Sequence, residues 1–143
     1  MRRLLVVLAL LVGCCLTSPA VASMAVGKAG PGQYAREDGR AGWTTHEVKL
    51  AVRGVARYFD PSGGVAKSVD VARCESRFNP RDTLGIYHGV FALSHEEFAD
   101  SWAKWRQVWR RWGLVRSVWN PRSNIAVALH RARTYGWGGW SCA

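Results

Sequence analysis

The chain has 143 residues, enough for one compact domain and too few for two ordinary ones. Its 20 lysines and arginines against 10 aspartates and glutamates give a formal net charge of +10. This excess favours polyanionic partners (nucleic acid, anionic lipid or a negatively charged cell wall), and it is also typical of a solvated basic surface.

The first 22 residues have the pattern of a secretory signal peptide. The charged start MRR precedes the apolar run LLVVLALLVGCCL and then TSPAVA, whose Ala-x-Ala pattern predicts cleavage after Ala22. Because this run is shorter than a bilayer-spanning helix, we expect no transmembrane span in the mature chain and a secreted or cell-wall location. The sequence LVGC leaves the alternative of a lipoprotein anchored through Cys14. Residues 23–43 are rich in glycine, alanine and charge, which predicts a flexible linker.

Four later segments carry the signals of helices. Thr44 begins the capping-box pattern Thr-Thr-His-Glu, and Ser94 begins a second one, Ser-His-Glu-Glu. The turn sequence DPSGG separates the first helix from the second, and the Asn79-Pro80 pair stops the second. Apolar residues recur at helical spacing, which predicts helices over residues 44–59, 65–79, 94–112 and 120–135.

The remaining segments lack a helical pattern. We expect a loop or a short hairpin over residues 81–94 and an irregular, glycine-rich tail after Tyr135. The predicted fold class is therefore all-α, with one small helical domain over residues 44–143. Tryptophans spaced three and four residues apart along the third helix are more typical of a core stripe than of a binding site, and they are Trp102, Trp105, Trp109 and Trp112.

Cleavage after Ala22 would leave Cys74 and Cys142 as the cysteines of the mature chain. An even pair in an exported protein predicts a disulfide, which here would pin the C-terminal tail to the second helix. Closing so long a loop would stabilise the fold by roughly 4 kcal/mol in the loop-entropy model. The alternative is a pair of unrelated buried thiols.

Glu75, in the stretch RCESRFNP, is the candidate catalytic residue. Cutting a glycosidic bond near neutral pH needs a carboxylic acid that an apolar environment keeps protonated. On a helix, Glu75 lies at the edge of the apolar face that includes Ala72 and Phe78. From periodicity alone, an ordinary surface glutamate paired with an arginine remains the alternative.

Three segments of the chain resemble those of a known family in their order and spacing, and they are RCESRFNP, YHGVFALS and NIAVALHRARTYGWGGWSC. They resemble the lysozyme-like transglycosylase (SLT-type) domain family, particularly small secreted actinobacterial members related to resuscitation-promoting factors. The resemblance covers roughly residues 44–143. It implies a helical lysozyme-like domain with a sugar-binding cleft, in which Glu75 is the general acid and base and Ser76 is its motif partner.

The resemblance also implies a set of substrate-binding residues in the loop after the catalytic helix and in the tail. They are Ser76, His88, Gly89, Val90, Phe91, Tyr135 and Trp137. The family usually has a glutamine where this chain has Ala92, and losing that side chain would weaken substrate positioning by about 1 to 3 kcal/mol. His88 is a candidate to compensate, whereas Trp140 beside Cys142 fits core packing at least as well.

The implied function is a peptidoglycan-cleaving glycosidase acting on the bond between N-acetylmuramic acid and N-acetylglucosamine. Attack by the muramyl 6-hydroxyl would make it a lytic transglycosylase, which we favour, and attack by water would make it a muramidase. Hydrolysis with two carboxylates needs a second acid, and each candidate also fits a turn, a helix cap or a solvated face. The candidates are Asp82, Glu96, Glu97 and Asp100.

Two other functions stay open. Ala92 motivates a non-catalytic peptidoglycan-binding module, and the arginine-rich tryptophan helix motivates a secreted nucleic-acid-binding protein. The inward position expected for the tryptophans argues against the second. We expect a monomer whose partners are peptidoglycan glycan strands and the anionic wall, with no specific nucleic acid, no cofactor and no metal, because the histidines lack close ligand partners.

Overall fold

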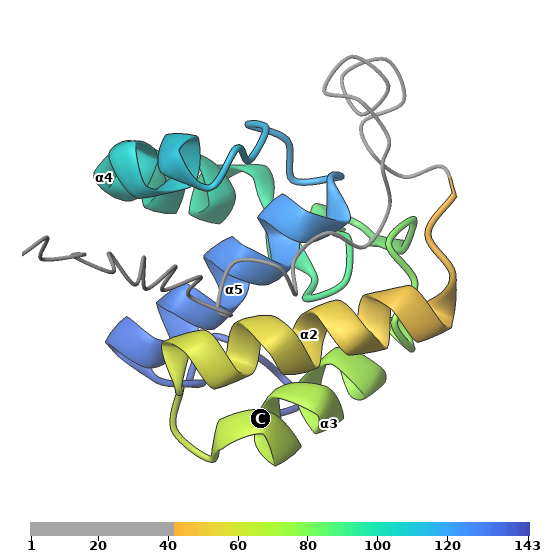
Figure 1. Ribbon diagram of the computed structural model, residues 1–143. Helices are drawn as coiled ribbons and strands as arrows, with labels where there is room; N and C mark the ends of the chain where they lie inside the picture. Colours follow the sequence, from red (N-terminus) through yellow and green to blue (C-terminus); the bar gives the residue numbers. More distant parts are fainter. Residues whose placement is uncertain (1–41) are drawn as a thin grey trace, which may run out of the picture.

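The computed structural model describes residues 42–143, and Figure 1 shows the arrangement of their helices. The helices are α2 Thr45–Phe59, α3 Gly64–Ser76, α4 His95–Arg111 and α5 Pro121–Tyr135, and the strands are β1 Thr83–Leu84, β2 Tyr87–His88 and β3 Leu93–Ser94. The predicted signal peptide, the lipoprotein alternative at Cys14 and the predicted linker up to residue 41 lie outside the described residues. Trp43, predicted to end that linker, instead packs against the core.

Helix α5 is the centre of the fold. Every residue from Ser123 to Leu129 is buried, so this stretch has no solvent-facing side. Such a helix needs neighbours all round it. Helix α2 packs on α5 and on α3, and α4 packs on α5 and β3, so that α5 lies between α2 and α4 (Figure 1). The result is the helix-dominated domain that the sequence predicts.

Side-chain caps fix where α2 and α4 begin. The Thr44 hydroxyl accepts the Glu47 backbone N–H at 3.2 Å, and the Glu47 carboxylate accepts the Thr44 backbone N–H at 2.8 Å. That backbone hydrogen bond is the main cause that lowers the pKa of Glu47. Ser94 and Glu97 form the same reciprocal pair at the start of α4. Both predicted capping boxes are therefore confirmed.

The segment predicted as a loop or short hairpin forms a small antiparallel sheet. Its strand order is β1-β2-β3, with Thr83 paired with His88 and Tyr87 paired with Ser94. The all-α prediction is therefore too simple, and the domain is mostly helical with three two-residue strands. Strands this short give almost no alternating pattern, so the sequence predicts at most one hairpin.

Helix α3 ends earlier than predicted. The sequence places the stop at Asn79-Pro80, whereas the helix ends at Ser76. Arg77 and Phe78 both adopt left-handed backbone angles, with φ of 54° and 64°. Non-glycine residues rarely adopt this conformation, so nothing in the local sequence marks the end of the helix. Two strained residues thus directly follow Glu75 and Ser76.

The tryptophan stripe of α4 faces the core only in part. Trp102 and Trp109 are buried as predicted, but Trp105 is 40% exposed. Its backbone angles, φ −120° and ψ 20°, are not helical, so the regular helical spacing of the tryptophans is interrupted at this residue. Trp105 lies on the ring of His130, with centroids 4.5 Å apart, and burial lowers the pKa of that histidine.

No helix within residues 42–143 is both long enough and apolar enough to cross a membrane.

Candidate functional site

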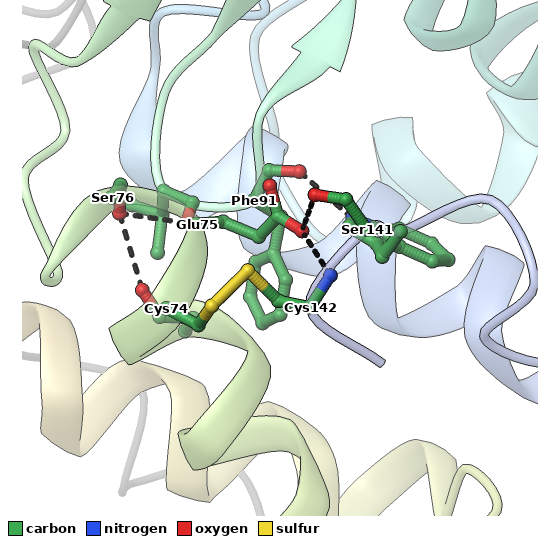
Figure 2. Close-up of a disulfide and its surroundings, with 9 residues drawn as sticks. Cys74, Glu75, Ser76, Phe91, Ser141 and Cys142 are labelled. Carbon is green, nitrogen blue, oxygen red and sulfur yellow. Dashed lines mark hydrogen bonds between the residues drawn. A yellow bond between two sulfur atoms is a disulfide. The ribbon is translucent and has the colours of Figure 1, made fainter.

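Glu75 lies in the last turn of α3 and is half-buried beside the C-terminal tail. Its Oε1 atom accepts the Cys142 backbone N–H at 3.2 Å and the Ser141 hydroxyl at 3.4 Å. Figure 2 shows these two donors converging on the carboxylate. Among the described residues, no hydrogen bond engages Oε2. The carboxylate is therefore held through one oxygen by a segment 66 to 67 residues away in sequence.

The predicted disulfide between Cys74 and Cys142 is confirmed. It joins the residue before Glu75 to the residue whose N–H contacts the Glu75 carboxylate (Figure 2). The covalent bridge therefore fixes the tail at the place where it meets the candidate acid. Trp140 adds a second attachment, because its Nε1–H donates to the Phe91 carbonyl at 2.8 Å.

Ser76 connects the end of α3 to the loop between β2 and β3. Its hydroxyl is buried and donates to the Val90 carbonyl at 2.8 Å and to the Ala72 carbonyl at 3.3 Å. The side chain thus turns inward, and it positions the loop rather than facing solvent. The resemblance implies a substrate-binding role for Ser76, and in this arrangement any such role is indirect.

Asn124 of α5 holds the same loop from the opposite side. Its Oδ1 accepts the Phe91 N–H at 2.9 Å, and its Nδ2 donates to the His88 and Val118 carbonyls at 3.0 Å each. The side chain is fully buried. Sequence reasoning missed this residue, whose only signal is a polar side chain on the apolar face of the last helix.

Gly89 allows this close approach. It has φ of 76°, and a Cβ added here would lie 2.6 Å from Asn124 Nδ2. No other amino acid fits there without displacing the amide. Ala92 also has a left-handed backbone, with φ of 46°, and its N–H donates to the Gly89 carbonyl at 3.3 Å. Ala92, at the position where the resemblance implies a glutamine, therefore completes a tight turn.

The remaining predicted substrate-binding residues divide into buried and exposed ones. Val90 and Phe91 are fully buried, so their side chains pack in the core and do not face solvent. Trp137 is also buried, and its Nε1–H donates to the Ser62 carbonyl. His88 is buried between the rings of His95 and Trp119, with centroids at 4.8 and 4.0 Å. Only Tyr135, which is 61% exposed, presents a free aromatic surface.

Two of the four candidate second carboxylates have positively charged partners. Glu97 lies 3.2 Å from Arg131, and Asp100 lies 2.8 Å from Lys104. Both distances join a carboxylate oxygen to a side-chain nitrogen. These two acids therefore have structural roles in or beside α4. Asp82 is half-buried, and Glu96 is exposed in the first turn of α4.

Two hollows of the described surface are lined by residues other than Glu75. An apolar groove of about 200 Å³ runs between α2 and the start of α5, and it is lined by residues that include Trp43, Leu50, Trp112 and Ile125. A shallower hollow of about 400 Å³ lies over Gly42–Thr45 and Asn79–Arg81. Glu75 lines neither. Within residues 42–143, no group of three or more histidines, cysteines or acids could hold a metal ion.

Comparison of the chain with family models, curated proteins and solved structures finds no match.

Proposed function

We propose that this protein is a peptidoglycan-cleaving glycosidase of the lytic transglycosylase type, with Glu75 as its general acid and base. The observation that carries the proposal is the isolated carboxylate at the end of α3, held through Oε1 with Oε2 not engaged by any described residue. Ser76, which follows Glu75 in the chain, and Asn124 both hydrogen-bond to the loop at Val90 and Phe91, which the resemblance assigns to substrate binding.

Backbone strain supports the same site. Arg77, Phe78 and Ala92 are three of the four non-glycine residues with positive φ within residues 42–143. The first two directly follow Ser76 in sequence, and the third lies in the loop that Ser76 contacts. Such conformations cost about 1 to 3 kcal/mol each and are common where a site must be preorganised. The strain therefore supports a functional role for this corner of the fold.

In the proposed reaction, Glu75 in its acid form gives its proton to the oxygen that links N-acetylmuramic acid to N-acetylglucosamine. The bond from that oxygen to the muramyl anomeric carbon breaks, and an oxocarbenium-like transition state forms. The Glu75 carboxylate then takes the proton of the muramyl 6-hydroxyl, while the oxygen of that hydroxyl bonds to the anomeric carbon. One carboxyl group suffices for both steps, which agrees with the ion pairs that engage Glu97 and Asp100.

The test is mass spectrometry of the soluble products after the oxidised mature chain is incubated with purified peptidoglycan. Wild type should release 1,6-anhydro-muropeptides, Glu75→Gln should release none, and Glu96→Gln, the same change at an exposed carboxylate, should behave as wild type. Reducing-end products would instead indicate a muramidase. Loss of activity in both variants would mean that the effect is not specific to Glu75.

A non-catalytic peptidoglycan-binding module is the second candidate. It is favoured by Ala92 and by the two hollows, neither of which Glu75 lines. Under this alternative, the protein is retained on insoluble peptidoglycan and releases no soluble product. The variant Ala92→Gln separates the two functions, because restoring a hydrogen-bonding side chain should raise turnover of a weak enzyme and should leave a binding module inactive.

A further inference from the structure

Charge is distributed unevenly along this chain. All ten aspartates and glutamates precede residue 101, so the second half of α4, α5 and the tail contain no acid. The basic residues of this part are Lys104, Arg106, Arg110, Arg111, Arg116, Arg122, Arg131 and Arg133. Such an asymmetry points to an anionic partner on the surface that these residues form.

Some of these cations have internal roles. Lys104 pairs with Asp100, Arg131 pairs with Glu97 and donates to the Ser101 hydroxyl at 2.9 Å, and Arg133 donates to the Asp60 carbonyl at 2.9 Å. Others have none. Within residues 42–143, no carboxylate lies within ion-pair distance of Arg106, Arg110 or Arg111, which are all exposed.

We call Arg106, Arg110 and Arg111, the exposed arginines in the second half of α4, the α4 basic face. They follow the kink at Trp105, and Arg106 and Arg110 are four residues apart, which places them on the same side of the helix about 6 Å apart along its axis. Trp109, which lies between Arg106 and Arg110 in sequence, is fully buried and fixes the rotation of this half-helix. Like charges at this spacing destabilise a helix, and no described acid compensates them.

We propose that the α4 basic face binds a phosphodiester polymer built on small polyols, of the kind that makes a cell wall anionic. Guanidinium groups match phosphate oxygens with paired hydrogen bonds, and several arginines along one helix can contact phosphates repeated along a chain. The choice of a cell-wall polymer rests on the proposed function. The face itself is a site separate from Glu75.

The aromatic residues around the face argue for a polymer without bases. Single-stranded nucleic acid is held by rings on which bases stack. Trp102 and Trp109 are buried, and Trp112 stacks on Phe59 at a centroid distance of 5.3 Å. Trp105 is 40% exposed and packs against His130 at an interplanar angle of 57°, so it is the one tryptophan of α4 with an exposed indole. The α4 basic face therefore offers phosphate-binding groups beside one partly exposed ring, and not the succession of rings on which consecutive bases stack.

The two sites lie on different parts of the fold. Glu75 belongs to α3, which packs on α2, whereas α4 packs on α5 and β3 (Figure 1). A polymer bound along α4 would leave the Glu75 corner open. The protein would then be held on the wall by one surface while glycan strands reach the other.

The test measures binding of the oxidised mature chain to lipid-free poly(glycerol phosphate) over a series of salt concentrations. The triple variant Arg106→Gln, Arg110→Gln and Arg111→Gln should bind at least about tenfold more weakly at 0.1 M salt, and the slope of log affinity against log salt should fall by roughly 2. The matched control removes the same charge from α2 and α3, through Arg53→Gln, Arg57→Gln and Lys67→Gln. It should lose less than about threefold.

Equal losses in both triple variants would overturn the proposal, because net charge alone would then explain binding. Tighter binding to single-stranded DNA of the same phosphate number would overturn the choice of partner. Circular dichroism of both variants checks that they are folded. The variant Glu75→Gln should bind the polymer as wild type does. The binding measurement can therefore be interpreted even if the glycosidase proposal fails.

Discussion

Asn124 should contribute more to stability than any other polar side chain near the Glu75 corner. In Asn124→Ala, the buried Phe91 N–H loses its acceptor, and the His88 and Val118 carbonyls lose their donor. An unsatisfied buried donor costs about 1 to 3 kcal/mol, and each carbonyl costs less because it has a second lone pair. The sum is about 3 kcal/mol, which would lower the Tm of a domain of this size by roughly 12 °C or more.

Urea unfolding at one pH measures this effect, with an unchanged slope showing that the unfolded state is the same. Asn79→Ala is the matched control, since its exposed Oδ1 accepts only the nearby Arg81 N–H at 3.0 Å. Its loss should be about 0.5 kcal/mol. If the two variants differ by less than 1 kcal/mol, the loop does not depend on the Asn124 amide and the reasoning fails.

Three further predictions follow from single contacts. Replacing Cys74 and Cys142 with serine should lower stability by about 4 kcal/mol, because the disulfide closes a loop of 68 positions, and equal denaturant midpoints for both forms would contradict this. Gly89→Ala should destabilise by about 2 kcal/mol, since its Cβ would meet Asn124, and an unchanged Tm would refute that clash. Burial lowers the pKa of His130, so the unfolded state binds its proton more readily, and stability should fall as pH drops through 6.5. In His130→Gln, unfolding at pH 7.5 and 5.5 should differ less than in wild type.

Sequence patterns predict the helices well where local chemistry decides them. The Thr44 and Ser94 caps place the starts of α2 and α4, since each cap bonds to a residue three positions away. Sequence patterns fail where contacts with distant residues decide where a helix ends. Arg77 and Phe78 end α3 with left-handed angles that their own side chains disfavour, and buried Phe78 must be held in place by the surrounding core.

The candidate site follows the same rule. The disulfide is predictable because the expected cleavage after Ala22 would leave two cysteines, which have one possible pairing. The roles of Ser76 and Asn124 are not predictable, because their partners among residues 88–91 lie 14 to 36 positions away. Periodicity carries no information on which loop reaches them. A buried polar residue on an apolar helix face is the signal that could have identified Asn124, because such groups are almost always hydrogen-bonded.

The tail contacts bear on which oxygen of Glu75 would carry a catalytic proton. Oε1 faces two donors, the Cys142 N–H and the Ser141 hydroxyl, so a proton on Oε1 would point an O–H group at an N–H group. In the proposed mechanism the proton therefore resides on Oε2. A disulfide needed only for stability could attach the tail at many places. Here it joins the neighbour of Glu75 to the residue that donates to its carboxylate, which ties the bridge to the orientation of the acid as well as to the stability of the fold.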